Sequence, residues 1–172
     1  DGPALQAQFS LPFRLAFDKA GDLYIADYSN YRIRKLEFKT NTVSTVAGTG
    51  VRGFKDGKAS EAQFDLPSDI AFDKAGDLYI ADRRNNRIRK LNIQTGIVST
   101  VAGTGVPGLR DGAALQALFN FPNGLAFDPQ GNLYISDIYN HRIRKLSPGG
   151  VVSTIAGASP ITGQNGPVQQ AG

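Results

Sequence analysis

The sequence predicts an all-β fold, a β-propeller built from four-stranded antiparallel blades, on the strength of three observations. A stretch covering residues 17–36 recurs at 72–91 and at 127–146, so the chain repeats itself with a period of 55 residues. Each copy contains short runs of branched and aromatic residues separated by turn formers, a pattern typical of strands. Four-stranded meanders that recur in tandem at such a period are typical of propeller blades. Three blades are therefore expected in this chain.

Turn residues delimit the strands of each blade. In the first copy, strands are expected at 13–18, 22–26, 32–39 and 42–47. Asp18, Asp73 and Asp128 each begin the turn between the first two strands, where an Asp side chain can bond nearby backbone N–H groups. In the third copy, Pro129 and Gly131 occupy positions that favour a tight antiparallel hairpin. One sheet of such short strands cannot bury both of its faces alone, so the blades are expected to stack on one another.

The repeat also predicts the domain organisation. We expect blade 1 with its leading connector at 1–55, blade 2 at 56–110, blade 3 at 111–164, and the start of a fourth unit at 165–172. Long connections follow the fourth strands, and 57–64 and 112–119 within them predict a single helical turn. In the first copy, Asp1 is expected to act as the N-cap of that turn, with Pro3 in its first turn.

Composition excludes several classes of function. The net charge is +4, but 9 of the 19 Lys and Arg residues belong to the repeated R-I-R-K run, so the charge recurs with the fold and is weak evidence for an anionic ligand. The chain has no Cys, which excludes disulfides, Cys-ligated zinc and thiol catalysis. No apolar run approaches the roughly 18 residues of a membrane span, and no stretch has the pattern of a signal peptide. A soluble protein is expected; its compartment stays open, with a place outside the bacterial cytoplasm as one option.

Three motifs carry a family resemblance. They are P-x-G-L-A-F-D, complete only at 122–128, G-[DN]-L-Y-I-[AS]-D in every copy, and N-x-R-I-R-K-L beginning at Asn30, Asn85 and Asn140. On these motifs the chain resembles the NHL repeat family. The resemblance implies a six-bladed propeller that serves as a binding platform, and some related enzymes hold a metal in the central channel. Arg14 and Asp69 replace the Gly that the motif has at Gly124, so the motif does not define the loop geometry of those two blades.

No catalytic group, cofactor or metal site is predicted. The G-x-G-x-x-G pattern at 48–53 and 103–108 lacks the long helix of a dinucleotide site and is interrupted by Pro107, so it is interpreted as a turn-rich connector. His141 is the only histidine, too few for a zinc-assisted hydrolase or lyase. A second ring of carboxylates, Asp27, Asp82 and Asp137, is expected to bond to turns and to pair with Arg32, Arg87 and Arg142.

Arginines of the third strand allow two interpretations. Arg34, Arg89 and Arg144 could form a basic belt that binds RNA or an acidic polysaccharide. Alternatively, the stems of these side chains pack against the neighbouring blade and their guanidinium groups pair with acids there. The second interpretation is favoured, and nucleic acid remains a less favoured partner.

The copies differ most in two loops that share one end of the blades. Binding residues often lie on loops that a rigid scaffold presents, so this divergence predicts a ligand face. Its candidate residues are Tyr28, Tyr31, Arg83, Arg84, Asn86, Ile138, Tyr139 and His141, together with Arg14 and Asp69 on the first strands.

The predicted function is a non-enzymatic scaffold that binds a protein, peptide or glycan on this loop face. The alternatives are a channel-centred, metal-dependent lactonase or lyase, and an anion or RNA binder that uses the R-I-R-K strands. No membrane partner is expected. Three blades make half of a six-bladed ring, so the chain is also expected to close the ring as a two-fold homodimer. The segment 165–171 resembles 1–7 and is expected to compete with it at each junction.

Overall fold

The structure is a computed structural model that describes residues 1–157, and the segment 165–172 expected to begin a fourth unit lies outside them. Three antiparallel sheets account for the regular structure. The first contains β1 (Gly2–Pro3), β2 (Pro12–Phe17), β3 (Leu23–Asp27), β4 (Arg32–Glu37) and β5 (Thr42–Ala47). The second contains β6 (Gly57–Lys58), β7 (Pro67–Phe72), β8 (Leu78–Asp82), β9 (Arg87–Asn92) and β10 (Ile97–Ala102). The third contains β11 (Gly112–Ala113), β12 (Pro122–Phe127), β13 (Leu133–Asp137), β14 (Arg142–Leu146) and β15 (Val151–Ala156).

Five short 3-10 helices are the other elements. They are η1 (Ala4–Gln6), η2 (Tyr28–Asn30), η3 (Arg83–Asn85), η4 (Ala114–Gln116) and η5 (Ile138–Asn140). None of the helices in the described part is long enough to cross a membrane. The predicted all-β class is confirmed, and the three sheets are the three expected blades.

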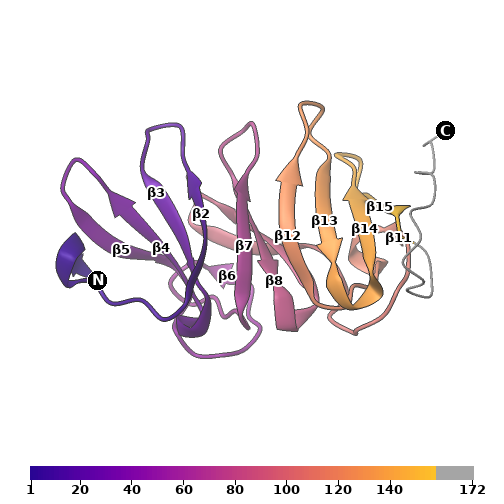
Figure 1. Cartoon of the computed structure of the whole chain (residues 1–172), viewed down its shortest axis with the longest axis horizontal. Helices are drawn as coiled ribbons and strands as arrows, with labels where there is room; N and C mark the ends of the chain where they lie inside the picture. Colours follow the sequence, from indigo (N-terminus) through magenta and orange to yellow (C-terminus); the bar gives the residue numbers. More distant parts are fainter. Residues whose placement is uncertain (158–172) are drawn as a thin grey trace.

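Each blade has five strands rather than the four that were expected. The four long strands form the predicted meander, and a two-residue strand from the preceding connector pairs with the outermost of them, as in the order β1-β5-β4-β3-β2. In Figure 1 the blades stand side by side, and the first long strands β2, β7 and β12 are neighbours. The hairpins that follow these strands lie at the upper edge. The connectors lie at the lower edge.

The tight hairpins form for the reason that the sequence indicated. Asp18 Oδ1 accepts the backbone N–H groups of Ala20 and Asp22, both at 2.9 Å, and Gly21 has a φ of 88°. Asp128 accepts the equivalent N–H groups of Gln130 and Asn132, and Asp73 accepts those of Gly76 and Asp77. This first ring of carboxylates therefore shapes turns.

The connectors depart from prediction at the N-cap. The 3-10 helices η1 and η4 provide the single helical turn in two connectors, whereas the second connector has only a turn there. Pro3 is the N-cap residue of η1, with no side-chain capping bond, so Asp1 is not the cap. Asp1 instead accepts hydrogen bonds from Arg34 and Thr45, because the pairing of β1 with β5 carries it to the outer edge of the blade.

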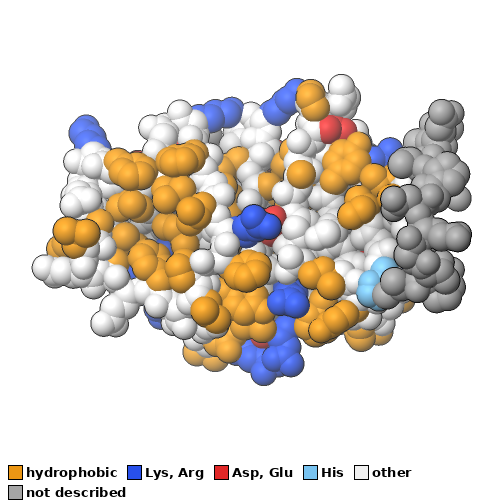
Figure 2. Space-filling view, in the orientation of Figure 1, with side chains coloured by type: hydrophobic (Ala, Val, Ile, Leu, Met, Phe, Trp, Pro, Cys, Tyr) orange, Lys and Arg blue, Asp and Glu red, His pale blue; other side chains and the backbone are white. Residues whose placement is uncertain are grey.

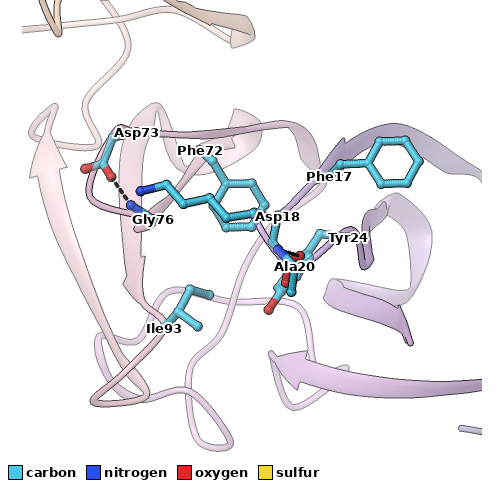
Figure 3. Close-up of a pocket in the computed structure, with 9 residues that line it drawn as sticks. Phe17, Asp18, Ala20, Tyr24, Phe72, Asp73, Gly76 and Ile93 are labelled. Atoms are coloured by element: carbon cyan, nitrogen blue, oxygen red, sulfur yellow. Dashed lines mark hydrogen bonds between the residues drawn. The ribbon is translucent and has the colours of Figure 1, made fainter. Parts of the chain in front are cut away.

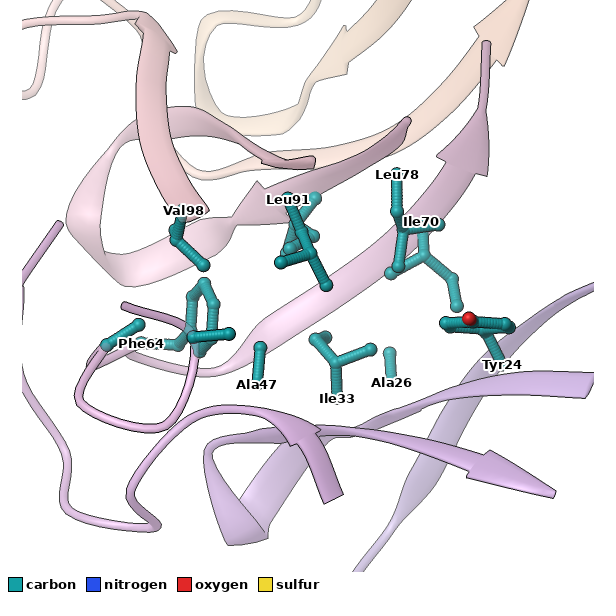
Figure 4. Close-up of a cluster of buried hydrophobic side chains, with 12 residues drawn as sticks. Tyr24, Ala26, Ile33, Ala47, Phe64, Ile70, Leu78, Leu91 and Val98 are labelled. Carbon is teal, nitrogen blue, oxygen red and sulfur yellow. The ribbon is translucent and has the colours of Figure 1, made fainter. Parts of the chain in front are cut away.

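The main cores lie between neighbouring blades. In Figure 4, Tyr24, Ala26, Ile33 and Ala47 of the first blade face Ile70, Leu78, Leu91 and Val98 of the second. A second cluster joins the second and third blades in the same way. Phe64 and Phe119, which come from the connectors, are fully buried in these two clusters. The stacking of blades is confirmed.

The expected basic belt is not on the surface. Arg34, Arg89 and Arg144 are buried, with at most 2% of each residue exposed. Each pairs with one carboxylate of its own blade and one of the preceding connector. The pairs are Arg34 with Asp27 and Asp1, Arg89 with Asp82 and Asp56, and Arg144 with Asp137 and Asp111. The basic belt is therefore wrong. These guanidinium groups pair with acids, as the second interpretation indicated, but the acids belong to the same blade and its connector rather than to the neighbouring blade.

The second ring of carboxylates pairs with a different arginine from the one expected. Asp82 accepts hydrogen bonds from Arg89 Nη1 at 2.7 Å, from Asn85 Nδ2 at 2.8 Å and from the backbone N–H of Asp65 at 2.8 Å. Arg87 instead donates to the carbonyl of Thr104 in the connector. Burial raises the pKa of Asp82 to about 6, against the opposing effects of Arg89 and these hydrogen bonds.

A glycine at the end of β10 permits the close approach of two segments. Gly103 has a φ of +94°, and a Cβ there would lie 2.5 Å from the carbonyl oxygen of Asn86. Gly76 has a φ of +96° but no atom within 4 Å of such a Cβ. We expect Gly103→Ala to lower the free energy of unfolding by about 1–3 kcal/mol more than Gly76→Ala, because both substitutions strain φ but only one creates a backbone clash. Urea denaturation of the two variants measures the difference, and equal midpoints would contradict the prediction.

Candidate functional site

The loop face, defined here as the end of the blades that carries η2, η3 and η5, is shaped by two local features. A β-bulge shifts the register early in each first strand, between Pro12 and Arg14 in blade 1, and at equivalent positions in the others. Each 3-10 helix is followed by a residue in the left-handed region, with φ values of 54°, 50° and 54° at Tyr31, Asn86 and His141. Bulges re-aim side chains, so residues of both loops meet at this end.

Five of these side chains make an unbroken line of contacts across the three blades. Phe13 stacks on Tyr28 with ring centroids 5.3 Å apart, and the Tyr28 hydroxyl accepts a hydrogen bond of 2.8 Å from Arg83 Nη1. The Arg83 guanidinium lies 5.5 Å from the centre of the Phe121 ring. That ring meets Tyr139 edge-on at 4.7 Å. We call this set the aromatic track.

The track is accessible. Tyr139 is 56% exposed and Phe13 is 50% exposed, while Arg84 beside Arg83 is also exposed. Figure 2 shows hydrophobic and basic side chains together along the lower edge of the molecule, where the loop face lies. Exposed aromatic faces next to guanidinium groups can stack on flat groups and bond to carboxylates or carbonyls. Arg83 Nε is buried without a hydrogen-bond partner in the structure.

The first strands place Arg14 and Asp69 away from the track. Asp69 is 9% exposed, and its two oxygens accept the backbone N–H groups of Ile70 and Leu125 at 2.9 and 2.7 Å. Burial raises the pKa of Asp69, while those bonds and the nearby charge of Arg14 oppose the shift. Asp69 is the one carboxylate on β2, β7 and β12, and both of its oxygens are occupied. Within residues 1–157, no three His, Cys, Asp or Glu side chains are grouped so as to hold a metal ion.

The remaining predicted residues of the ligand face have different surroundings. Asn86 is buried, and its side chain bonds to Phe121 N and the Gly105 carbonyl, so it holds two loops together. Ile138 and His141 border a cavity of about 230 Å³ on the open side of blade 3. Tyr31 is half-buried. The structure therefore brings Tyr28, Arg83 and Tyr139 into one site and leaves the other residues at its margins.

Phe121 is the residue of the track that the sequence did not single out. It is equivalent to Leu11 and Leu66, and all three adopt a positive φ of 52–59°. The change from Leu to Phe in one copy was the available signal. Phe13 lay among the divergent positions at the start of its strand, but only the bulge shows that it meets Tyr28.

A second type of groove lies at the opposite edge, between neighbouring hairpins. One such groove, of about 340 Å³, is shown in Figure 3 with Phe17, Tyr24, Phe72 and Ile93 from two blades around it. An equivalent groove recurs between the second and third blades. Lys19 spans the first of them by donating to the Lys74 carbonyl at 2.6 Å. Because this groove recurs with the fold while the track does not, the track is the stronger candidate for a specific site.

Comparisons with known proteins agree with the fold. The family model described as NHL repeat matches residues 64–91 and 119–146. NHL repeat-containing protein 2 of Gallus gallus is 38% identical over 105 residues, which is 60% of this chain and 14% of that protein. Teneurin-3 of Mus musculus is 30% identical over 165 residues, or 88% of this chain and 6% of that protein. This chain thus corresponds to a small part of these relatives.

Solved structures show the same architecture. An auxiliary nutrient binding protein from Bacteroides thetaiotaomicron has a TM-score of 0.69 at 30% identity, with 83% of this chain and 37% of that chain covered. A streptogramin B lyase has a TM-score of 0.60 at 15% identity, with 90% of this chain and 43% of that chain covered. The second likeness concerns the fold alone.

Proposed function

This chain belongs to the NHL repeat family, and we propose that it is a non-enzymatic binding module that holds an extended, acidic peptide segment on its loop face. The observation that carries the proposal is the aromatic track. It joins all three blades through residues that the repeat does not conserve between its copies. A line of contacts that crosses every blade suits an extended ligand better than a compact one.

The residue types of the track favour a peptide. Aromatic and arginine side chains are enriched at the energetic centres of protein interfaces. Small ligands instead bind in concave pockets that bury most of their surface. Arg83 and Arg84 lie side by side in η3 with no acidic partner among the described ion pairs, whereas most of the other Arg residues bond to acids or carbonyls. A carboxylate of the ligand would meet both guanidinium groups.

A glycan is the second candidate ligand, because one solved structure similar to this chain is named a nutrient binding protein. Sugar rings also stack on exposed aromatic faces, so the track alone does not separate the two classes. Arrays of acidic peptides and of glycans, probed with the same labelled protein, separate them. Binding to glycans alone would contradict the peptide assignment and retain the binding function.

A metal-dependent lyase or lactonase is the rival function, since a lyase shares the fold. Asp69 carries the only carboxylate on the first strands, and its oxygens are already bonded to backbone N–H groups. Metal analysis of the purified chain tests this alternative. A stoichiometric calcium or zinc ion that disappears in Asp69→Ala would contradict the proposed function.

We expect the double variant Arg84→Ala, Tyr139→Ala to lose about 10- to 100-fold in affinity for the best acidic peptide, because interface hot spots of this kind contribute more than 1 kcal/mol each. The matched control is Lys39→Ala, Phe38→Ala, which removes one exposed cation and one exposed ring from the opposite edge. Isothermal titration of both variants measures the effect. Equal losses in the two variants would show that the loop face is not the binding site.

A further inference from the structure

The two ends of the row of blades carry opposite halves of one repeated contact. Inside the chain, the front face of one blade packs on the back face of the next. The front face of blade 1 consists of Tyr24, Ala26, Ile33 and Ala47, and the back face of blade 2 consists of Ile70, Leu78, Ile80, Leu91 and Val98. The front face of blade 2 packs on the back face of blade 3 in the same way. Within the described residues, no neighbouring blade covers the back face of blade 1 or the front face of blade 3, although Ile25 and Val43 of that back face are buried, at 4% and 3% exposure.

A phenylalanine from the connector completes each internal junction. Phe64 belongs to the back side of blade 2, and its ring lies against Gly48 of blade 1, so that a Cβ on Gly48 would lie 3.2 Å from the ring. Phe119 lies against Gly103 of blade 2 in the same manner, at 3.1 Å. Both rings are fully buried. Each junction thus has a ring on one side and a glycine-lined recess on the other.

Blade 1 presents this ring without a recess to receive it. Phe9 is the equivalent of Phe64, and the Arg34 guanidinium lies 5.2 Å from its centre, as Arg89 lies 5.2 Å from that of Phe64. The ring is therefore held in the same relation to its own blade. It is nevertheless 37% exposed, and Leu15 is 60% exposed where the equivalent Ile70 is 4% exposed.

Blade 3 presents the recess without a ring. Gly157 has a φ of +101°, as Gly48 has, and a Cβ on it would strike the carbonyl of His141 as one on Gly48 would strike that of Tyr31. Beside Gly157, a cavity of about 230 Å³ is lined by apolar groups that include Ile143 and Ala156. Ile143 is 39% exposed, whereas the equivalent Ile33 and Ile88 are fully buried. Among the described residues, the recess is preformed and holds no ring.

We propose that the back face of blade 1 docks on the front face of blade 3 of a second copy of this chain, with Phe9 seated in the recess beside Gly157. Each copy carries one ring and one recess, so two copies related by a two-fold axis make two identical junctions and leave no open face. Propellers have about 4–8 blades, and six is the only multiple of three in that range. Two copies of this three-bladed unit would therefore complete a ring of six blades.

The pairing also extends the loop face. Inside the chain, each junction places the start of one first strand beside the 3-10 helix of the preceding blade, as Phe121 lies beside Arg83. At the new junction, the same geometry sets Leu11 and Phe13 of one copy beside Ile138 and His141 of the other. The two aromatic tracks then lie on one continuous face.

The experiment measures the mass of the 172-residue chain by light scattering over a range of concentrations. The expected mass is twice the 18.4 kDa of one chain. Phe9→Asp removes the ring and Ile143→Asp blocks the recess, and each variant alone is expected to be monomeric because a buried, unpaired charge is costly. Val51→Asp, at a connector residue that is 59% exposed, is the matched control and is expected to remain a dimer.

Mixing the two monomeric variants supplies the sharpest readout. In a mixed pair, one junction carries both substitutions and the other carries an intact Phe9 and an intact Ile143, so the mixture is expected to recover the double mass. Circular dichroism checks that each variant retains its strands, and Phe9→Ala replaces Phe9→Asp if the latter does not fold. A wild-type chain of 18.4 kDa at all concentrations would overturn the proposal. So would an Ile143→Asp variant that still dimerises, because blade 1 would then pair with blade 1.

Discussion

Replacing Arg89 with alanine is expected to lower the free energy of unfolding by about 3–5 kcal/mol, because it leaves the buried carboxylate of Asp82 without its partner. Arg89 is fully buried and also bonds to Asp56 and to the carbonyls of Gln63 and Lys55. Arg84→Ala, at an exposed position five residues earlier, is the matched control and should change stability by less than about 0.5 kcal/mol. Urea denaturation followed by circular dichroism measures both.

The loss should also depend on pH. Burial raises the pKa of Asp82 from 3.8 to about 6 in the folded protein, and the charge of Arg89 opposes that rise. A carboxyl whose folded-state pKa is raised favours folding at low pH, and that contribution is lost as pH rises through the folded value. Without the charge of Arg89 the pKa of Asp82 rises further, so Arg89→Ala should lose more stability at pH 8 than at pH 5. The role assigned to Arg89 and Asp82 would be contradicted if Arg89→Ala lost the same stability at pH 5 and pH 8. A urea midpoint equal to that of the unsubstituted protein would contradict it as well.

Phe64→Ala is expected to cost about 3–5 kcal/mol, because it empties the recess beside Gly48 at the junction of the first two blades. Phe38→Ala removes the same side chain from a position that is 53% exposed and should cost less than about 1 kcal/mol. Thermal unfolding of the two variants gives the comparison. If both midpoints move equally, the ring of Phe64 does not carry the contact between blades.

Features that recur in every copy were predictable from the sequence. The Asp18 turn and the four long strands depend on local residue types, and three copies gave three observations of each. The first two strands begin and end within one residue of the predicted limits. The third ends at Glu37 rather than 39, where the chain turns toward β5.

Features that depend on distant segments were not predictable. The strand Gly2–Pro3 is too short to have a strand pattern, and it forms only because it meets Thr42 and Val43. Arg87 and Arg89 lie two residues apart on one strand and so point to the same side, and the alternation of side chains could not tell which of them meets Asp82. The second carboxylate partner of Arg89, Asp56, is 33 residues away from it in the sequence. Pairings at that separation appear only once the connector is placed.

The candidate site combines both kinds of feature. Divergence between copies pointed to Tyr28, Arg83 and Tyr139, and the structure places them in one line of contacts because loops that share an end of a meander lie close together. It also pointed to Asn86, whose buried side chain forms hydrogen bonds to two other loops. Exposed residues of the track and buried residues such as Asn86 both vary between copies, and only their burial in the structure distinguishes them.

The arginine that bonds to both its blade and the connector before it has a consequence for how such a protein grows by gene duplication. A duplicated segment that starts just before Asp56 and ends just before Asp111 contains Arg89 and both of its carboxylate partners, so its charges are balanced wherever it is inserted. A segment cut between Asp56 and Asp82 would leave Arg89 with Asp82 but without Asp56, so its second carboxylate would have to come from the preceding unit. The packing of Phe64 differs from this ion pairing. Its ring belongs to the duplicated segment, but it fills a recess beside Gly48 in the preceding blade. A new blade is therefore electrically complete by itself, but its packing depends on whichever blade precedes it.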